Sequence, residues 1–267
     1  GDHREDHDDS LHDAADNDLA AGSQALTTLY LALAGEAFNI DVDQTTVQQD
    51  ALYVHLRRPD GIPDLQQQIE HGVINLLSGY RASGHSFVGI IETFEGRGFL
   101  GDVASVSDQK FYDPSLKPDE VRGNRSGKPD DRWAGTNKDT SLEYQVITAL
   151  VAASRLLRGY NDTLAEECLA TAIKAWEYEQ NHEPVIQPNA YVPQHHEWQE
   201  VHATCELLIT TGEDRFRSRL YELLPVIKEN PGEVGWSVAR ALKAINDQLF
   251  TDQVKEALAS YKKKLDA

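Results

Sequence analysis

The sequence contains no methionine and only two cysteines. Because it begins at Gly1 rather than at Met, we expect it to follow a proteolytic cut, a tag remnant or an upstream domain. Cys168 and Cys205 supply neither a disulfide framework nor a metal-ligand spacing, and each falls within an amphipathic helical pattern. We therefore predict two buried free thiols.

Basic charge and long apolar runs are also scarce. Lys and Arg total 25 against 44 for Asp and Glu, which gives a formal net charge of −19. Without a basic run, the chain lacks the electrostatic footprint that nucleic acid or anionic lipid requires. No apolar run approaches the roughly 20 residues that cross a bilayer. We expect no nucleic-acid partner and no membrane insertion, while the 40% hydrophobic content suffices for one sizeable core.

Helical periodicity dominates the rest of the chain and predicts an all-α fold of stacked helical hairpins. Asp139 or Thr140 is placed to cap the third helix, Gly159 to end it, and Asp162 to cap the fourth. The last helix reaches the end of the sequence without a stop signal. The eight predicted helices span about residues 19–37, 63–80, 140–157, 162–176, 198–212, 216–227, 238–249 and 254–265.

Residues 83–138 break this pattern. They are rich in Gly, Asp, Ser and Pro with scattered aromatic residues, and they show little periodicity. Loops of this length within a compact domain are commonly functional. We interpret the segment as a functional loop in preference to a surface excursion held by its own small anchor.

The first 18 residues form the densest polar cluster, with eight acidic residues and three histidines. Three interpretations compete: a solvated terminus, a site for a divalent metal, and a pair of carboxylates that share one site. The last rests on Asp13 and Asp16, which flank two alanines just before an apolar helix and could together polarise a water molecule. Composition alone favours the solvated terminus.

A resemblance changes this weighting. Residues 10–19 resemble the Asp-Ala-Gly-Asp signature of glycoside hydrolase family 9, the family of many cellulases, with Ala15 in place of the glycine. Residues 58–65 are similar to the family's Asn-Gly-Ile-Pro-Asp-Leu helix start, residues 149–169 to its alanine-rich hairpin, and residues 209–213 to its Thr-Gly-Asp turn. The resemblance covers nearly all of the chain from Asp13 onward. The order and spacing of these segments together make it specific.

The resemblance implies an (α/α)6 barrel that hydrolyses β-1,4-linked glucan with inversion at the anomeric carbon. Such chemistry uses two carboxyl groups about 6.5–9.5 Å apart, with a water between base and sugar. By the family motif, Asp16 would be the general base and Asp13 would help to hold the water. In the long loop, Trp133 could stack on a glucose face or anchor the loop, and Arg132 could bind sugar hydroxyls or pair with a neighbouring aspartate.

The family's general-acid glutamate has no counterpart that we can assign, because no glutamate after Ile227 has the family context. We therefore predict a single, partial catalytic domain over residues 1–267, with an incomplete barrel of the six-hairpin type and an active-site loop at residues 83–138. The alternative is a catalytically incomplete barrel that binds carbohydrate without turnover. The three glutamates considered are Glu229, Glu233 and Glu256.

The resemblance also bears on cofactors, partners and location. The chemistry requires no cofactor, and a structural calcium is conceivable among the loop carboxylates, although no EF-hand spacing is present. The expected partner is a β-glucan polysaccharide or oligosaccharide, and the expected location is secreted or periplasmic. A structural metal held by the N-terminal His and Asp residues is a third, weaker hypothesis, and the sequence leaves the oligomeric state open.

Overall fold

The computed structural model describes residues 19–48, 51, 53–91, 108, 110–129, 133–187 and 192–266. Helices dominate these residues, which confirms the predicted all-α class. The nine helices of the described chain are α1 (Ala21–Phe38), α2 (Asp64–Ser83), α4 (Thr140–Leu157), α5 (Asp162–Gln180), α6 (His196–Thr211), α7 (Asp214–Glu222), α8 (Leu224–Glu229), α9 (Pro231–Ile245) and α10 (Gln248–Leu265).

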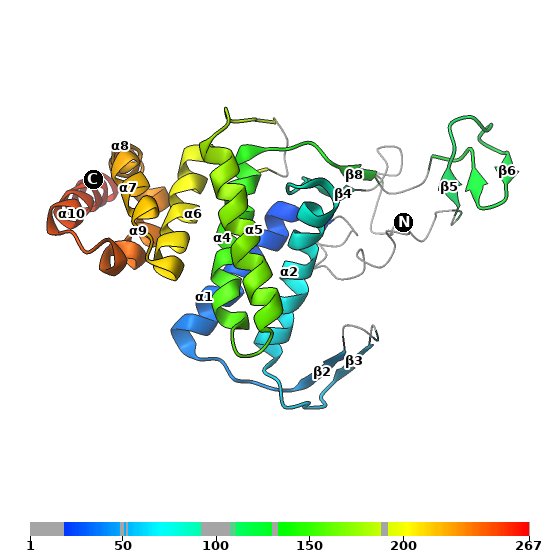
Figure 1. Cartoon of the computed structure of the whole chain (residues 1–267), viewed down its shortest axis with the longest axis horizontal. Helices are drawn as coiled ribbons and strands as arrows, with labels where there is room; N and C mark the ends of the chain where they lie inside the picture. The colour runs from blue at the N-terminus through cyan, green and yellow to red at the C-terminus, as the bar shows by residue number, and fades with distance from the viewer. Residues whose placement is uncertain are drawn as a thin grey trace.

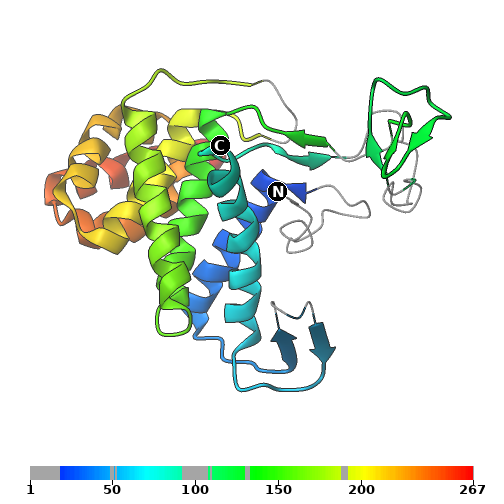
Figure 2. The ribbon, with the colours of Figure 1, turned by 45° about the vertical axis from the view of Figure 1, so that its right-hand side comes forward.

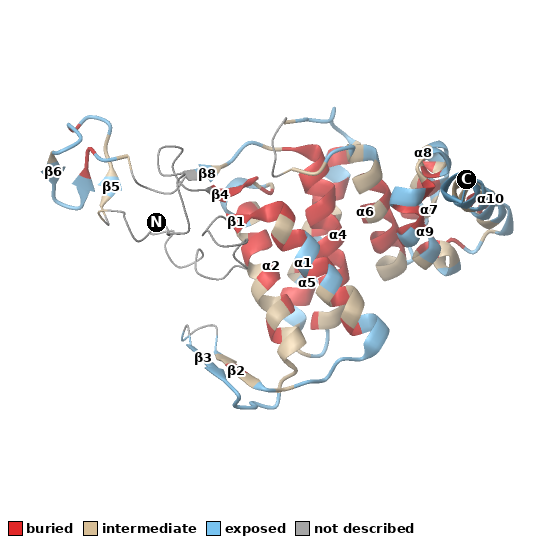
Figure 3. Ribbon diagram, turned by 180° about the vertical axis from the view of Figure 1, so that it is seen from behind, coloured by how far each residue is buried: buried red, intermediate tan, exposed pale blue. Residues whose placement is uncertain are grey.

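The helices form two layers of successive hairpins (Figure 1). The inner layer is the row α1, α4, α6 and α9, in which each helix packs against the next, and the outer layer comprises α2, α5, α7 with α8, and α10. Helix α4 is central, since all of its residues except Arg155 and Leu156 are buried. Figure 3 shows this buried centre where α4 meets its neighbours.

The strands of the described residues are short and lie in three small sheets. Two of the sheets, the β2–β3 hairpin and the β5–β7–β6 sheet, stand away from the helices (Figure 2). Residues 83–138 were expected to form a loop with little periodicity, but their described part contains the strands β4 to β8. The strands are β1 (Leu19–Ala20), β2 (Thr45–Gln48), β3 (Tyr53–Leu56), β4 (Gly89–Ile91), β5 (Phe111–Tyr112), β6 (Val121–Arg122), β7 (Arg125–Ser126) and β8 (Trp133–Gly135).

Local sequence signals explain several boundaries. The Asp139 side chain caps α4 by accepting a hydrogen bond from the Leu142 amide at 3.0 Å, as one of the two predicted caps. Gly159 has φ of 80° and follows the end of α4, a backbone conformation that glycine adopts readily. Both cysteines are buried free thiols, as predicted.

Three details of the helix prediction were wrong. Asn161, not Asp162, caps α5 through the Leu164 amide, while Asp162 accepts from the Gly159 amide. The helix expected over residues 216–227 is divided into α7 and α8, because Pro225 lacks the amide hydrogen that a continuous helix needs. The helix expected to reach Leu249 ends at Ile245, and Leu249 lies on α10 with 72% of its surface exposed.

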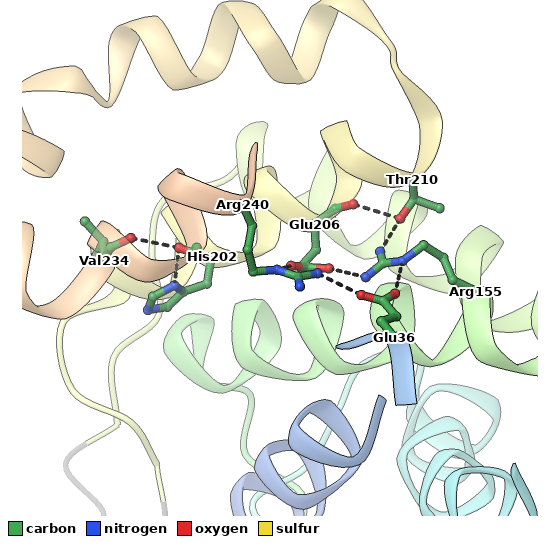
Figure 4. Close-up of polar contacts among 8 residues, drawn as sticks. Glu36, Arg155, His202, Glu206, Thr210, Val234 and Arg240 are labelled. Carbon is green, nitrogen blue, oxygen red and sulfur yellow. Dashed lines mark hydrogen bonds and ion pairs between the residues drawn. The ribbon is translucent and has the colours of Figure 1, made fainter. Parts of the chain in front are cut away.

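Four charged residues of alternating sign join the inner helices (Figure 4). Arg155 of α4 contacts Glu36 of α1 at 2.5 Å and Glu206 of α6 at 2.6 Å. Arg240 of α9 contacts the same two carboxylates, at 3.0 Å for Glu36 and 3.2 Å for Glu206. Each of the four helices therefore contributes one charge, from its C-terminal half, to a closed cycle that we call the charge ring.

The charge ring is largely buried, so its charges must be compensated within the protein. The side chain of Glu206 is fully buried, so its charge depends on both arginines for compensation. For Glu36, burial by itself raises the pKa, but the hydrogen bonds and positive charges of Arg155 and Arg240 outweigh it and leave the pKa lowered. Glu36 is therefore held as the ionised partner of the two arginines.

A second polar contact joins α6 to α9. The ring Nδ1 of His202 lies 2.8 Å from the Ser237 hydroxyl oxygen, which donates in turn to the Val234 carbonyl (Figure 4). The imidazole stacks on Trp236 with ring centroids 4.9 Å apart. Burial lowers the pKa of His202 to about 4, so the folded protein holds this histidine neutral.

We predict that Glu206→Gln lowers the free energy of unfolding by about 3–5 kcal/mol, because it removes one partner of a buried charge network. Urea unfolding followed by circular dichroism measures the change. The matched control is Glu120→Gln, whose carboxylate pairs with Arg122 on the surface and should change stability by about 1 kcal/mol or less. Equal losses in the two variants would contradict the role of the charge ring.

We also predict a histidine-dependent loss of stability in weak acid. Because the folded pKa of His202 is about 4 and the unfolded value is near 6.5, the unfolded chain binds the proton more tightly. Stability from this residue is complete above pH 6.5 and is lost as the pH falls toward 4. In urea unfolding measured at several pH values, His202→Gln should reduce the fall of the unfolding midpoint between pH 6.5 and 4. His55→Gln, at an exposed histidine, should leave that fall unchanged.

Candidate functional site

Two inner helices, α1 and α4, each come after a strand of one small sheet, α1 after β1 and α4 after β8. Strand β4 is central in this sheet and pairs antiparallel with β1 and β8. The register aligns Leu19 with Ile90 and Ile90 with Ala134. Gly89 permits the close approach of β1, since a Cβ there would lie 2.4 Å from the Leu19 carbonyl oxygen. Strands β1 and β8 therefore run parallel on either side of β4, with Leu19 and Ala134 at the same level of the sheet.

A buried carboxylate fixes the approach to β4. Glu143, in the first turn of α4, accepts hydrogen bonds from the Ser86 amide at 2.7 Å and hydroxyl at 2.9 Å. Tyr80 of α2 donates a third hydrogen bond at 2.7 Å. Burial raises the pKa of Glu143, although the hydrogen bonds from Tyr80 and Ser86 act to lower it. Burial and the charge of Glu143 together raise the pKa of Tyr80 well above 10.

A second buried carboxylate fixes the segment between β8 and α4. Glu179, at the end of α5, pairs with Lys138 and accepts a hydrogen bond from the Thr140 hydroxyl at 2.8 Å. The Thr140 hydroxyl oxygen also accepts from the Val185 amide at 2.9 Å, while the Thr140 amide donates to the Val185 carbonyl. These contacts hold the segment after β8, the end of α5 and the chain after α5 together.

A cavity of about 580 Å³ opens between the first residues of α4 and the segment that leads into α6. Asp139 lies in its wall, where the second carboxylate oxygen accepts from the Gln187 amide at 2.7 Å. His195, with φ of 60°, precedes α6 and stacks on Trp198 at 4.0 Å between ring centroids. The N-termini of both helices border the cavity, and their partial positive charge favours ligand oxygens.

The predicted site residues stand as follows. Asp13, Asp16 and Arg132 lie outside the described residues, so their assignments stay predictions. Trp133 is the first residue of β8, where it pairs with Ile91 of β4. The segment that carries Trp133 and the strand that follows the Asp pair therefore belong to one sheet.

Sequence reasoning missed the buried carboxylates Glu143 and Glu179. Glu143 stands three residues after Thr140, a spacing that fits an ordinary capping pattern at the start of a helix. That pattern predicts an exposed first-turn glutamate, whereas the side chain is buried against α2 and Ser86. Only the close packing of α2 on α4 distinguishes a buried glutamate from an exposed one at this position. Helical periodicity does not indicate how the two helices pack.

Among the described residues, no group of three or more His, Cys, Asp or Glu side chains is arranged to hold a metal ion. His195 and His196 lead into α6, and the His196 Nδ1 lies 3.5 Å from a Glu197 carboxylate oxygen. Within the same part of the chain, no helix is both long and apolar enough to span a membrane.

Comparison with known proteins identifies the fold. No family model matches the sequence, and no curated protein does. The structure is similar to the glycoside hydrolase family 9 endoglucanase J30, with a TM-score of 0.64 and 19% identity over 94% of this chain and 45% of that one. It is also similar to cellulase Cel9M of C. cellulolyticum, with a TM-score of 0.61 and 12% identity over 96% of this chain and 55% of that one.

A family 9 protein of Bacteroides ovatus gives a TM-score of 0.59 and 16% identity over 96% of this chain and 46% of that one. The chain thus spans about half the length of the solved proteins that it matches. It has the fold of part of a family 9 endoglucanase, and the predicted incomplete (α/α)6 barrel is confirmed. Cellulase Cel9M has also been solved in complex with cellobiose.

We predict that Tyr80→Phe lowers the free energy of unfolding by about 1.5–3 kcal/mol, because buried Glu143 loses one of its hydrogen-bond donors. Urea unfolding measures the loss. Tyr30→Phe is the matched control, since Tyr30 is 60% exposed and should change stability by no more than about 0.5 kcal/mol. A Tyr80→Phe variant as stable as the control would show that Glu143 does not depend on this contact.

Proposed function

We propose that the protein hydrolyses β-1,4-linked glucan with inversion at the anomeric carbon. The observation that carries the proposal is the likeness of 82–96% of the chain to family 9 endoglucanases. The motif resemblance around Asp13 and Asp16 points to the same reaction independently of the fold. The domain proposed is a single partial catalytic domain over residues 1–267, with residues 83–138 as its active-site loop.

In the proposed reaction, Asp16 removes a proton from a water molecule that Asp13 helps to hold. The water attacks the anomeric carbon from the face opposite the leaving oxygen, so the configuration inverts. A carboxylic acid about 6.5–9.5 Å from the base must protonate that oxygen. General-acid assistance of this kind contributes roughly 10²–10⁴ to the rate.

The described residues supply a frame for this chemistry. Strand β1 follows Asp16 by three residues, and β8 begins with Trp133, which we propose as a platform for a sugar ring, with Arg132 binding hydroxyl groups. The neighbouring cavity has Asp139 and Gln187 in its wall, and these polar groups suit a hydroxylated ligand better than an apolar one.

The second candidate function is binding of carbohydrate without turnover. It is favoured by the span of the chain, which covers 35–55% of the solved proteins, together with the absence of an assigned general acid. The resemblance to family 9 supports two further proposals. We propose that the protein is exported from the cell, and that loop carboxylates hold a calcium ion that takes no part in the chemistry.

The decisive experiment incubates the chain with β-1,4-gluco-oligosaccharides and records the anomeric protons by NMR from the first minutes. We expect the α-anomer to appear first, because inversion of a β-linkage yields it. Asp16→Asn should lower kcat by about 10²–10⁴-fold. Asp9→Asn, in the same acidic stretch, is the matched control and should retain activity.

A β-anomer formed first would exclude the inverting mechanism. Full activity of Asp16→Asn would exclude Asp16 as the general base. Binding of the oligosaccharides without release of reducing ends would instead support the second candidate function.

A further inference from the structure

The outer edge of β2 in the β2–β3 hairpin is covered by two aspartates. The Thr45 amide donates to the Asp64 carboxylate at 3.0 Å, and the Val47 amide donates to the Asp60 carboxylate at 3.2 Å. Since both amides bond outside the sheet, Thr45 and Val47 belong to the pairs that exchange no hydrogen bonds with β3. A further strand could pair with this edge only by displacing both carboxylates.

The outer edge of β3 is open. Val54 lies opposite Val47 and Leu56 lies opposite Thr45, so Val54 and Leu56 also direct their backbone N–H and C=O groups away from the hairpin. No hydrogen bond reaches these groups from any part of the chain that the structure describes. Strand β3 lies on the side of the hairpin away from the helices (Figure 2), and its four residues are all exposed. An open strand edge of this kind is a template for another strand.

Apolar side chains accompany the open edge. Val54 is 59% exposed and Leu56 is 72% exposed, and the register places both on the same face of the hairpin as Val47. A two-stranded hairpin is at best marginally stable in water, whereas three or more strands with an apolar face are independently stable. Pairing with a further strand would therefore stabilise the hairpin and cover part of its apolar surface.

The chain leaves the strand directly after Leu56. Arg57 has φ of 62°, a left-handed conformation that is uncommon outside glycine, and it lies in a turn. Neither Arg57 nor Arg58 forms an ion pair with any residue that the structure describes. The open edge is therefore short and is bordered by uncompensated positive charge, which favours an acidic partner. A second copy of this chain, with its net charge of −19, is such a partner.

We propose that β3 pairs with β3 of a second copy about a twofold axis, which joins two hairpins into one four-stranded antiparallel sheet. With His55 on the axis, Val54 of each copy lies opposite Leu56 of the other. Since both residues direct their backbone groups outward, each of the two Val54–Leu56 pairs exchanges two hydrogen bonds. The same register places Arg57 of one copy opposite the exposed Tyr53 of the other, an arrangement that favours a cation–π contact.

The two unlike edges of the hairpin select a second copy over an unrelated strand and over a fibre. The outward residues of β3 are two positions apart, so the edge is complementary to itself about a twofold axis. The aspartates close both outer edges of the combined sheet, which stops assembly at two copies. Because such short strands bury less than the roughly 800 Å² per partner of a standard interface, we expect a dissociation constant in the micromolar range. The pairing does not depend on the proposed function.

Sedimentation velocity of the full chain from about 1 to 300 µM tests this proposal. The solution is kept at about pH 8 and about 150 mM salt, where exposed histidines are neutral and the net charge is screened. Val54→Pro removes an outward amide but no hydrogen bond to β2, and Leu56→Lys places a charge on the paired edge. Each should raise the dissociation constant at least about tenfold, because the twofold axis repeats the change. Leu249→Lys, at a leucine of α10 that is also 72% exposed, is the matched control and should leave it unchanged.

Amide hydrogen exchange locates the contact. The Val54 and Leu56 amides should exchange more slowly in concentrated than in dilute solution, and circular dichroism checks that each variant is folded. A monomer–dimer equilibrium that is weakened in both edge variants but not in the control supports the proposal. A chain that stays monomeric, a dimer that both edge variants leave intact, slower exchange confined to α1, or growth beyond two copies overturns it.

Discussion

The arrangement of the inner helices depends on the charge ring. A fully buried carboxylate such as Glu206 is strongly destabilising unless it is paired, and here both of its partners come from other helices. A slip of α4 or α9 along its axis would break contacts with two carboxylates at once, because each arginine holds both Glu36 and Glu206. The ring therefore ties the positions of four helices to one another.

Fixing these helices at their C-terminal halves places their N-termini at a common end. That end carries the β1–β4–β8 sheet and the cavity beside α4 and α6. Two more buried carboxylates act there, Glu143 on the segment before β4 and Glu179 on the segment after β8. Buried charges thus order the helices at one end and hold the loops at the other, while apolar contacts fill the layer between.

Helical periodicity predicted the layers well because the core is built from long amphipathic segments. Asp139 before α4 and Gly159 after it were predictable, because the start and end of a helix depend on residues that are neighbours in the sequence. Pairings across space were beyond this reasoning: Arg155 and Glu206 look like ordinary surface charges of a helix until α1 and α9 are placed beside them. The β4–β8 pairing joins residues far apart in the chain, so no local pattern in residues 83–138 indicated it.

Helix α1 shows the same limit in another way. Apolar residues occur on nearly all of its sides, a pattern that normally marks a helix surrounded by protein. In the described part of the chain, however, α1 has the inner neighbour α4 on one side only, and Leu26, Tyr30 and Phe38 are exposed. An inner helix of a closed barrel has an inner neighbour on each side. The exposed apolar surface of α1 and the match to about half of each solved barrel therefore have one physical explanation: the described helices form an open arc of the inner layer.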